Sequence, residues 1–253
     1  MKKTFILFSL SFAFFIGYSP LQAQTQEAQV ELPNKLGLRS IGATLGIGAT
    51  DMNLNEINDH LQVLGIGRLD NMLSAYNFSI YTGFNGGFGL SIDVNGAISL
   101  GSELYNSNSW ITLKTFSFGP TFYYPLFTTN RIRLMAVGGL RDNDMSFEYN
   151  ANTNASPGFD NLLANPAANS NAIILESIST ESATFGARFQ YRLGKKENLK
   201  PREYSIGIDS GYNYSFDAIA WREPGSKNII RDMPAIKPDH FYLNFTFSAL
   251  LLR

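Results

Sequence analysis

The stretch Phe241–Ala249 alternates between apolar and polar side chains. Phenylalanine, leucine and alanine occupy its odd positions, and the even positions are polar: Tyr242, Asn244, Thr246 and Ser248. Alternation with a period of two predicts a β-strand with one apolar and one polar face. Soluble antiparallel sheets and membrane barrels both contain such strands, so the rest of the chain decides between them.

Seven earlier stretches show the same alternation and predict seven further strands. They are Leu38–Ala49, Asn71–Phe84, Gly87–Leu100, Trp110–Tyr124, Arg131–Asp142, Ser179–Leu193 and Glu203–Phe216. In the fourth, Ile111 and Leu113 have the parity of the polar side chains, and a β-bulge near Lys114 would restore the phase. Pro120 predicts a local defect in the pairing of the same strand, because proline has no N–H to donate.

The number, length and connections of these strands are typical of an outer-membrane barrel. Each strand reaches the roughly 9–11 residues that cross a bilayer at a tilt. Every second connection is short: Asn85–Gly86, Pro125–Asn130 and Gly194–Arg202. Two of the others, Asn143–Ile178 and Asp217–Asp239, are long. Short turns at one end and long loops at the other predict an all-β fold, an eight-stranded antiparallel transmembrane β-barrel, with its long loops outside the cell.

The composition of the polar face separates this barrel from a soluble one. Its members are mainly Gly, Ser, Thr and Asn, whereas a solvated outer face would carry many Lys and Glu. Only 16% of the residues are charged, against about 25% in ordinary globular chains. We therefore expect the apolar face to contact outer-membrane lipid and the sheet to close, with the last strand paired to the first. The net charge of -1 gives no reason to expect nucleic acid as a partner.

The N-terminus predicts export. Lys2 and Lys3 precede an apolar run, Phe5–Gly17, that is too short to span a membrane, and a small residue, Ala23, precedes the expected cleavage point. The predicted organisation is a signal peptide at 1–23, a periplasmic N-terminal tail at 24–35 and the barrel domain at 36–253. The alternative is an uncleaved anchor helix. The chain has no cysteine, which excludes disulfides, zinc–thiolate sites and lipid attachment at a thiol.

One short helix is predicted in the first extracellular loop. Asn53 is suited to cap it. Its apolar side chains share one face: Leu54, Ile57, Leu61 and Leu64. That face is expected to close the barrel mouth, or else to dock on a partner.

From Leu36 to its C-terminus the chain resembles the small eight-stranded outer-membrane barrels of the OmpA, OmpX and OmpW type. The resemblance rests on the strand pattern. The Ala-Gln cleavage context and the Asn-rich loops are similar to barrels from Bacteroidota. The resemblance implies an integral protein of the Gram-negative cell envelope, located in the outer membrane and porin-like in architecture.

The predicted inner face carries charged residues, which we expect to form a lumen charge network: Asp93, Arg133, Arg188, Arg192 and Asp209. Unpaired buried charge is costly, so opposite charges should pair there. The network is either a structural plug or a gated path for ions or protons. Eight strands leave a lumen just wide enough for side chains to fill, which argues against an open pore.

The sequence offers little for catalysis. His60 and His240 are its only histidines, and neither stands in a recognisable nucleophile–base arrangement. Neither a phosphate-binding glycine loop nor a metal-ligand cluster is evident, so no cofactor is expected. The predicted function is non-catalytic: a structural or partner-binding role through the extracellular loops, including that of an accessory subunit of an envelope complex. The alternatives are a narrow channel or transporter for ions or small hydrophobic molecules, and a lipid-modifying enzyme.

Overall fold

The computed structural model describes residues 37–63, 67–100, 110–150, 172–193, 202–230 and 233–252. The predicted signal peptide and N-terminal tail lie outside these ranges. The elements, in chain order, are β1 Leu38–Met52, α2 Asn55–Val63, β2 Met72–Phe84, β3 Gly89–Leu100, β4 Trp110–Thr128, β5 Ile132–Asn150, β6 Ala172–Ser177, β7 Thr180–Leu193, β8 Arg202–Ser215, β9 Trp221–Arg222 and β10 His240–Leu252.

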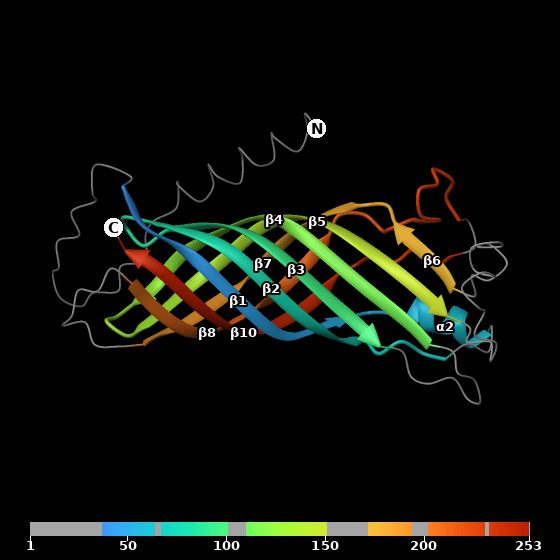
Figure 1. Cartoon of the computed structure of the whole chain (residues 1–253), viewed down its shortest axis with the longest axis horizontal. Helices are drawn as coiled ribbons and strands as arrows, with labels where there is room; N and C mark the ends of the chain where they lie inside the picture. Colours follow the sequence, from blue (N-terminus) through green and yellow to red (C-terminus); the bar gives the residue numbers. More distant parts are fainter. Residues whose placement is uncertain are drawn as a thin grey trace, which may run out of the picture. The chain divides into compact units, whose positions relative to one another are not determined.

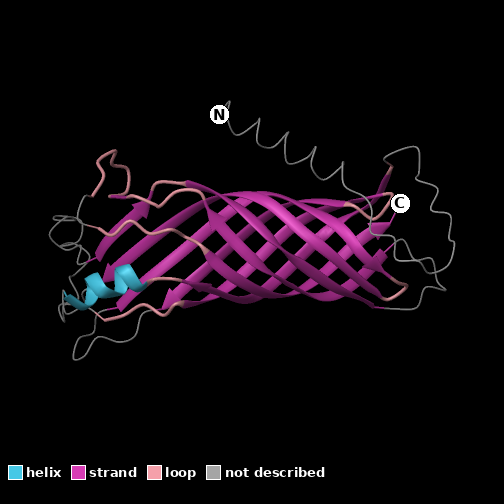
Figure 2. Cartoon of the chain, turned by 180° about the vertical axis from the view of Figure 1, so that it is seen from behind, coloured by secondary structure: helices cyan, strands magenta, loops and turns pink. Residues whose placement is uncertain are grey.

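The long strands form a closed antiparallel barrel (Figure 1, Figure 2). Around the ring the order is β1, β2, β3, β4, β5, β7, β8 and β10. The ring closes because β10 pairs with β1, from Ser40↔Leu252 to Met52↔His240. This confirms the predicted fold and the predicted pairing of the last strand with the first.

The connections alternate in length, as the sequence indicates. The turns after β2 and β4 lie at one end of the barrel, together with the end of β7 and the start of β8, and we call this the short-turn end. The elements α2, β6 and β9 lie at the other, the long-loop end (Figure 1). In the turn after β2, the residues with positive φ are Gly86 (87°) and Gly87 (88°). The turn therefore extends one residue beyond the predicted Asn85–Gly86, because two glycines in a row allow both positive φ angles.

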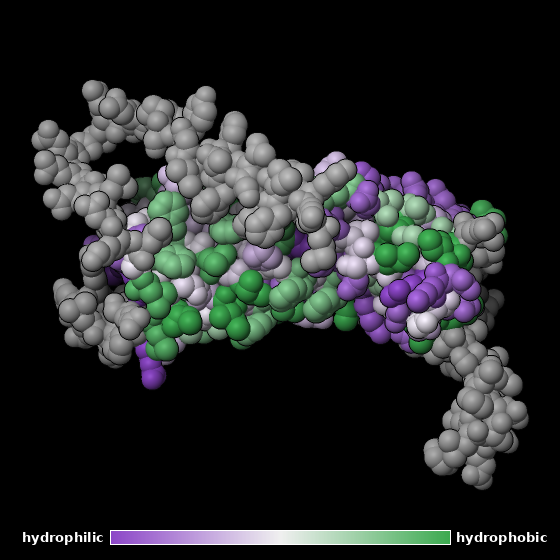
Figure 3. Space-filling view, turned by 90° about the horizontal axis from the view of Figure 1, so that it is seen from above, coloured by the Kyte–Doolittle hydropathy of each residue, from purple (hydrophilic) through white to green (hydrophobic). Residues whose placement is uncertain are grey.

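An apolar belt covers the outside of the barrel. Large side chains on it are exposed, among them Ile47 (72%), Phe241 (63%) and Phe245 (61%). Figure 3 shows apolar side chains over much of the uncovered wall and hydrophilic ones gathered toward one end. Exposed charged residues border the belt: Asp51, Lys114, Asp142 and Glu181 toward the long-loop end, and Arg39, Arg131 and Arg202 at the short-turn end. An exposed apolar surface on a sheet without open edges is the surface of a protein embedded in lipid.

Strands β4 and β5 continue beyond the belt at the long-loop end. The predicted loop Asn143–Ile178 is therefore wrong at both of its ends. Residues 143–150 extend β5, and Ala172–Ser177 form β6, which pairs with this extension from Ser146↔Glu176 to Asn150↔Ala172. β9 adds to β6 through Glu176↔Arg222 and Ser177↔Trp221. The wall of the barrel therefore projects past the membrane at the long-loop end. Among the described residues no helix has the length and apolarity needed to cross a membrane.

The predicted bulge near Lys114 is also wrong. Lys114 pairs with Ile98 on β3 and with Ser146 on β5 in an unbroken register, and the register shift of β4 lies between Pro125 and Phe127. The prediction of a defect at Pro120 is confirmed, because pairing of β4 with β5 stops at Phe118 and resumes at Thr121.

Candidate functional site: the barrel lumen and its cap

The lumen holds an ionic cluster near the short-turn end. Glu203 on β8 pairs with two cations through one oxygen. Arg133 Nη2 donates to Glu203 Oε1 at 3.4 Å, and Arg192 Nε lies 3.3 Å from the same oxygen as an ion pair without hydrogen-bond geometry. All three side chains are largely buried, with 12–16% of each exposed. Two arginines sharing one carboxylate leave an excess of positive charge at this level.

A second cluster lies deeper in the membrane-spanning part and is centred on Arg188 of β7. Its Nε is 3.0 Å from Asp209 Oδ2, and its Nη2 contacts the same oxygen. The guanidinium carbon lies 4.5 Å from the ring centroid of Tyr123 on β4, so the cation also stacks on an aromatic face. Only 1% of the Arg188 side chain is exposed, which makes the partners on β8 and β4 essential to its burial.

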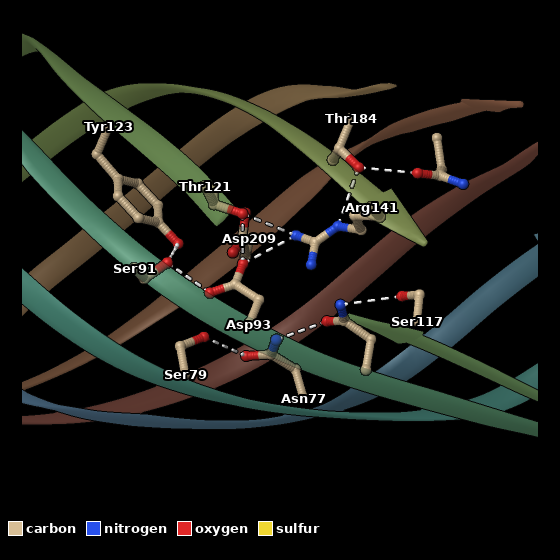
Figure 4. Close-up of polar contacts among 12 residues, drawn as sticks. Asn77, Ser79, Ser91, Asp93, Ser117, Thr121, Tyr123, Arg141, Thr184 and Asp209 are labelled. Atoms are coloured by element: carbon tan, nitrogen blue, oxygen red, sulfur yellow. Dashed lines mark hydrogen bonds and ion pairs between the residues drawn. The ribbon is translucent and has the colours of Figure 1, made fainter. Parts of the chain in front are cut away.

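The third charged pair joins β3 to β5. Asp93 accepts hydrogen bonds from three groups: Arg141 Nη2 at 2.8 Å, Thr121 Oγ1 at 2.7 Å and Ser91 Oγ at 2.5 Å (Figure 4). Arg141 Nε also donates to Thr184 Oγ1 at 3.0 Å. Figure 4 shows these side chains converging from several strands. Three donors compensate the burial of this carboxylate, so the Asp93–Arg141 pair fills and cross-links the barrel.

Neutral polar side chains fill the space between the charged pairs. Asn77 Nδ2 donates to Asn95 Oδ1 at 2.6 Å, and Asn95 Nδ2 donates to Ser117 Oγ at 3.2 Å (Figure 4). On the other side of the ring, Ser182 and Thr184 donate to Asn213 Oδ1. Because most lumen side chains are held by a neighbour on another strand, the interior is an ordered polar core.

The five residues predicted for a lumen charge network all lie inside the barrel. Arg133 and Arg192 belong to the cluster at Glu203, whereas Arg188 pairs with Asp209 and Asp93 with Arg141. Tyr123 links the last two pairs, because Arg188 stacks on its ring and its hydroxyl lies 3.1 Å from Ser91 Oγ, which donates to Asp93. The sequence prediction missed Glu203 and Arg141. Parity contained the signal for both, since Arg141 has the parity of Arg133, and Glu203 that of Asp209.

A cavity of about 50 Å³ remains within the lumen, on the long-loop side of Arg188. Several buried polar atoms of residues that line it have no hydrogen-bond partner in the protein: Arg141 Nη1, Asp209 Oδ1, Asn213 Nδ2 and Asn244 Oδ1. A polar cavity of this size accommodates water, which would satisfy these groups.

On the long-loop side of the cavity the inward-facing side chains become apolar, and we call this part of the barrel the cap. Ile111 and Leu113 of β4 face inward here, as do Met145 and Phe147 of β5, and all are at most 5% exposed. Trp221 of β9 is fully buried; its ring lies edge-on to Phe147 with the centroids 6.5 Å apart, and its Nε1 donates to Pro234 O at 3.0 Å. This apolar interior, and not a bulge, explains the phase of Ile111 and Leu113.

The helix α2 completes the cap. Leu54, Ile57 and Leu61 are buried in the same apolar cluster, and Leu64 lies outside the described residues. Asn53 Oδ1 accepts from Asn55 N, the first residue of α2, at 3.1 Å. The first helical turn is closed by Leu54 O, which accepts from Asn58 N at 2.9 Å, so Leu54 is the N-cap residue and the predicted Asn53 precedes it. The buried Asn58 holds the returning chain, because its amide group accepts from Leu69 N (2.8 Å) and donates to Leu69 O (3.0 Å).

The two histidines lie on different elements at the long-loop end. His60 is on α2, and His240 begins β10, where its Nδ1 is 2.9 Å from Pro238 O. Within the described ranges, no group of three or more His, Cys, Asp or Glu residues is arranged to hold a metal ion.

A closed eight-stranded barrel with an apolar outer belt and a polar interior defines an integral outer-membrane protein. No known protein family matches the sequence, and no curated protein matches it. Three solved structures with similar folds are outer-membrane proteins. One is a major outer membrane protein from Thermus thermophilus, with a TM-score of 0.47 and 13% identity over 84% of this chain and 99% of that one. Another is the attachment invasion locus protein Ail of Yersinia pestis in complex with the heparin analogue sucrose octasulfate, with a TM-score of 0.39 and 14% identity over 84% of this chain and 97% of that one. The third is the outer membrane protease OmpT of Escherichia coli, with a TM-score of 0.34 and 8% identity over 92% of this chain and 100% of that one.

Proposed function

We propose that the protein is a non-catalytic, non-conducting barrel that anchors a projecting loop end in the outer membrane and presents it to a partner. The observation that carries this proposal is closure of the lumen at two levels by different chemistry. Charged pairs cross-link the membrane-spanning part, and the apolar cap with α2 covers the mouth.

The projecting end has features suited to partner contact. Beyond the lipid belt, exposed apolar side chains include Val63 (86%), Ile229 (55%), Ile173 (54%) and Ile174 (42%). Exposed apolar groups outside the membrane favour association with another surface. Trp221, on the same long-loop end, is buried in the cap instead.

One observation favours the second candidate, a narrow channel. The cavity lined by Arg141 and Asp209 is polar and would hold water midway along the barrel. An open path through the protein would require movement of Arg188 on the short-turn side of the cavity. It would also require movement of the cap on the long-loop side.

Conductance of the purified full-length protein in a planar bilayer separates the two candidates. We expect no stable unitary openings. Stable openings in the unaltered protein would overturn the plugged barrel. The triple variant Arg188→Ser/Asp209→Ser/Leu113→Ser removes obstructions at both levels and should raise the leak, while Lys114→Gln on the outer surface should not.

The partner role is tested by co-purification from native membranes in a mild detergent. A protein that co-purifies with the unaltered chain should be lost with Ile173→Ser/Ile174→Ser and retained with Ile80→Ser, which lies on the lipid belt. Equal retention by both variants would contradict a role for the projecting wall.

A further inference from the structure

A groove of about 590 Å³ runs along the outside of the barrel across β7, β8, β10 and β1. Figure 1 shows β8, β10 and β1 side by side along this wall. All four strands contribute apolar side chains: Leu45 and Ile47 on β1, Phe189 and Tyr191 on β7, Ile206 and Ile208 on β8, and Phe245 and Phe247 on β10. These residues are neighbours in the ladder, with Tyr191 opposite Ile206 and Ile206 opposite Phe247. The groove is therefore one continuous feature of the lipid-facing surface.

The groove extends from near the short-turn end to the middle of the belt. Tyr191 is two residues from the end of β7 at Leu193, whereas Phe245 and Phe247 lie in the middle of β10. The acyl chains of a lipid with its headgroup at the short-turn end therefore lie alongside the groove.

Two arginines lie between the groove and the short-turn end of the barrel, although neither lines the groove itself. Arg131 Nη1 donates to Tyr191 Oη at 3.3 Å, so this cation is tied to a side chain that lines the groove. Arg202 begins the outward-facing row of β8 that continues through Tyr204 to Ile206. Both arginines are exposed, and neither is in a salt bridge with a carboxylate of the described residues. The adjacent Glu203 faces the lumen and is engaged by Arg133 and Arg192.

We propose that this groove binds a phospholipid, with an acyl chain along Phe189, Ile206 and Phe247 and the phosphate group at Arg131 and Arg202. The groove volume is in the usual range for a bound small molecule. Its apolar walls suit a hydrocarbon chain, and arginine suits phosphate because its planar fork donates two parallel hydrogen bonds. A second copy of the chain fits less well, since a symmetric pair packed through this face would bring the same arginines together without carboxylates.

Native mass spectrometry of the full-length protein in non-ionic detergent, with added phosphatidylglycerol, tests the proposal. We expect one lipid to be retained above the background of non-specific adducts. Arg131→Gln/Arg202→Gln should weaken retention by about fivefold for each arginine removed, the order of magnitude for one basic side chain beside an anionic lipid. Ile206→Trp should weaken it by obstructing the groove.

Matched controls separate site-specific binding from general changes of the surface. Lys114→Gln removes a cation at the opposite edge of the belt, and Ile80→Trp adds an indole to the belt outside the groove; both should retain the lipid, and heat-dependent gel mobility confirms folding of each variant. A diacylglycerol with the same chains, which lacks phosphate, should bind as weakly as phosphatidylglycerol binds to the double arginine variant. Equal retention of the two lipids, equal losses in the control variants, or a lipid-free dimer of the unaltered chain would each overturn the proposal.

Discussion

The membrane-spanning part of the barrel and its cap are built by the same strands with opposite polarity. Along β5, Leu134, Ala136 and Leu140 face outward in the lipid belt, whereas Met145 and Phe147 face inward in the cap. From Met135 to Phe147, β5 keeps one register with β4, while its other neighbour changes from β7 to β6. The difference shows that the solvent on the outer side selects which face is apolar: lipid favours apolar outside, and water favours apolar inside.

The largest expected effect comes from the cap core. Trp221→Ala should destabilise the cap by about 3–5 kcal/mol, because it leaves a cavity and removes the hydrogen bond to Pro234. Limited proteolysis should then cleave the long-loop end rapidly, while heat-dependent gel mobility still reports a folded barrel. Trp221→Phe should show a smaller effect. Cooperative loss of the whole barrel would contradict an independent cap core.

A charge on the belt should have the next largest effect. Phe78→Arg should reduce the free energy of unfolding from vesicles by about 2–4 kcal/mol, since Phe78 faces lipid. The same residue type placed outward in the cap, Ser146→Arg, should change it by less than about 0.5 kcal/mol. Urea titration of the refolded protein compares them, and similar costs at both sites would mean that the cap lies in lipid.

Loss of the Asn58 side chain should have an intermediate effect. Asn58→Ala removes two hydrogen bonds to Leu69 and leaves buried backbone groups unpaired, at a cost of about 1–3 kcal/mol to the docking of α2. Amide hydrogen exchange should accelerate in α2 and around Leu69 but not in β7 or β8. Unchanged exchange in α2 would show that apolar packing alone holds the helix.

The smallest effect is expected at the outer edge of the belt. Lys114 and Glu148 form an exposed ion pair at 3.0 Å, and such pairs contribute about 0–1 kcal/mol. Lys114→Gln should therefore leave the urea midpoint almost unchanged, and it should also abolish the little salt dependence that the pair contributes. A midpoint shift as large as that of Phe78→Arg would rule out simple solvent exposure of the pair.

Most of the barrel could be predicted from the sequence because a strand in lipid has a strict two-residue period. The closing pair β1–β10 follows from that period and from the prohibition of open edges in a bilayer. Beyond the belt the side chains still alternate, but from Asp142 onward the apolar ones face inward. A rule that assumes lipid on the outside therefore predicts loop at Met145 and Phe147 and a bulge at Ile111 and Leu113. β6 and β9 are short, and their pairing depends on the neighbouring wall more than on their own pattern.

The sequence predicts which charged residues face the lumen, but it does not predict which of them pair with each other. Parity places Asp93 and Arg188 inside, but which carboxylate meets which guanidinium depends on the stagger of strands that are distant in sequence. Arg141 reaches Asp93 on β3 because β3 and β5 both flank β4. No spacing within a single strand contains that information.

A spin-label scan along β5 tests the reversal of polarity most directly, and the absence of cysteine from the chain makes single-cysteine variants straightforward. Labels at Leu134, Ala136 and Leu140 should be relaxed by oxygen dissolved in lipid, and labels at Asp142 and Asp144 by a water-soluble nickel complex. Labels at Met145 and Phe147 should be shielded from both. Alternation that continues through residue 147 with this switch between Leu140 and Asp142 is the predicted result. Lipid exposure at Met145 or Phe147, or loss of alternation beyond Asp142, would contradict the account.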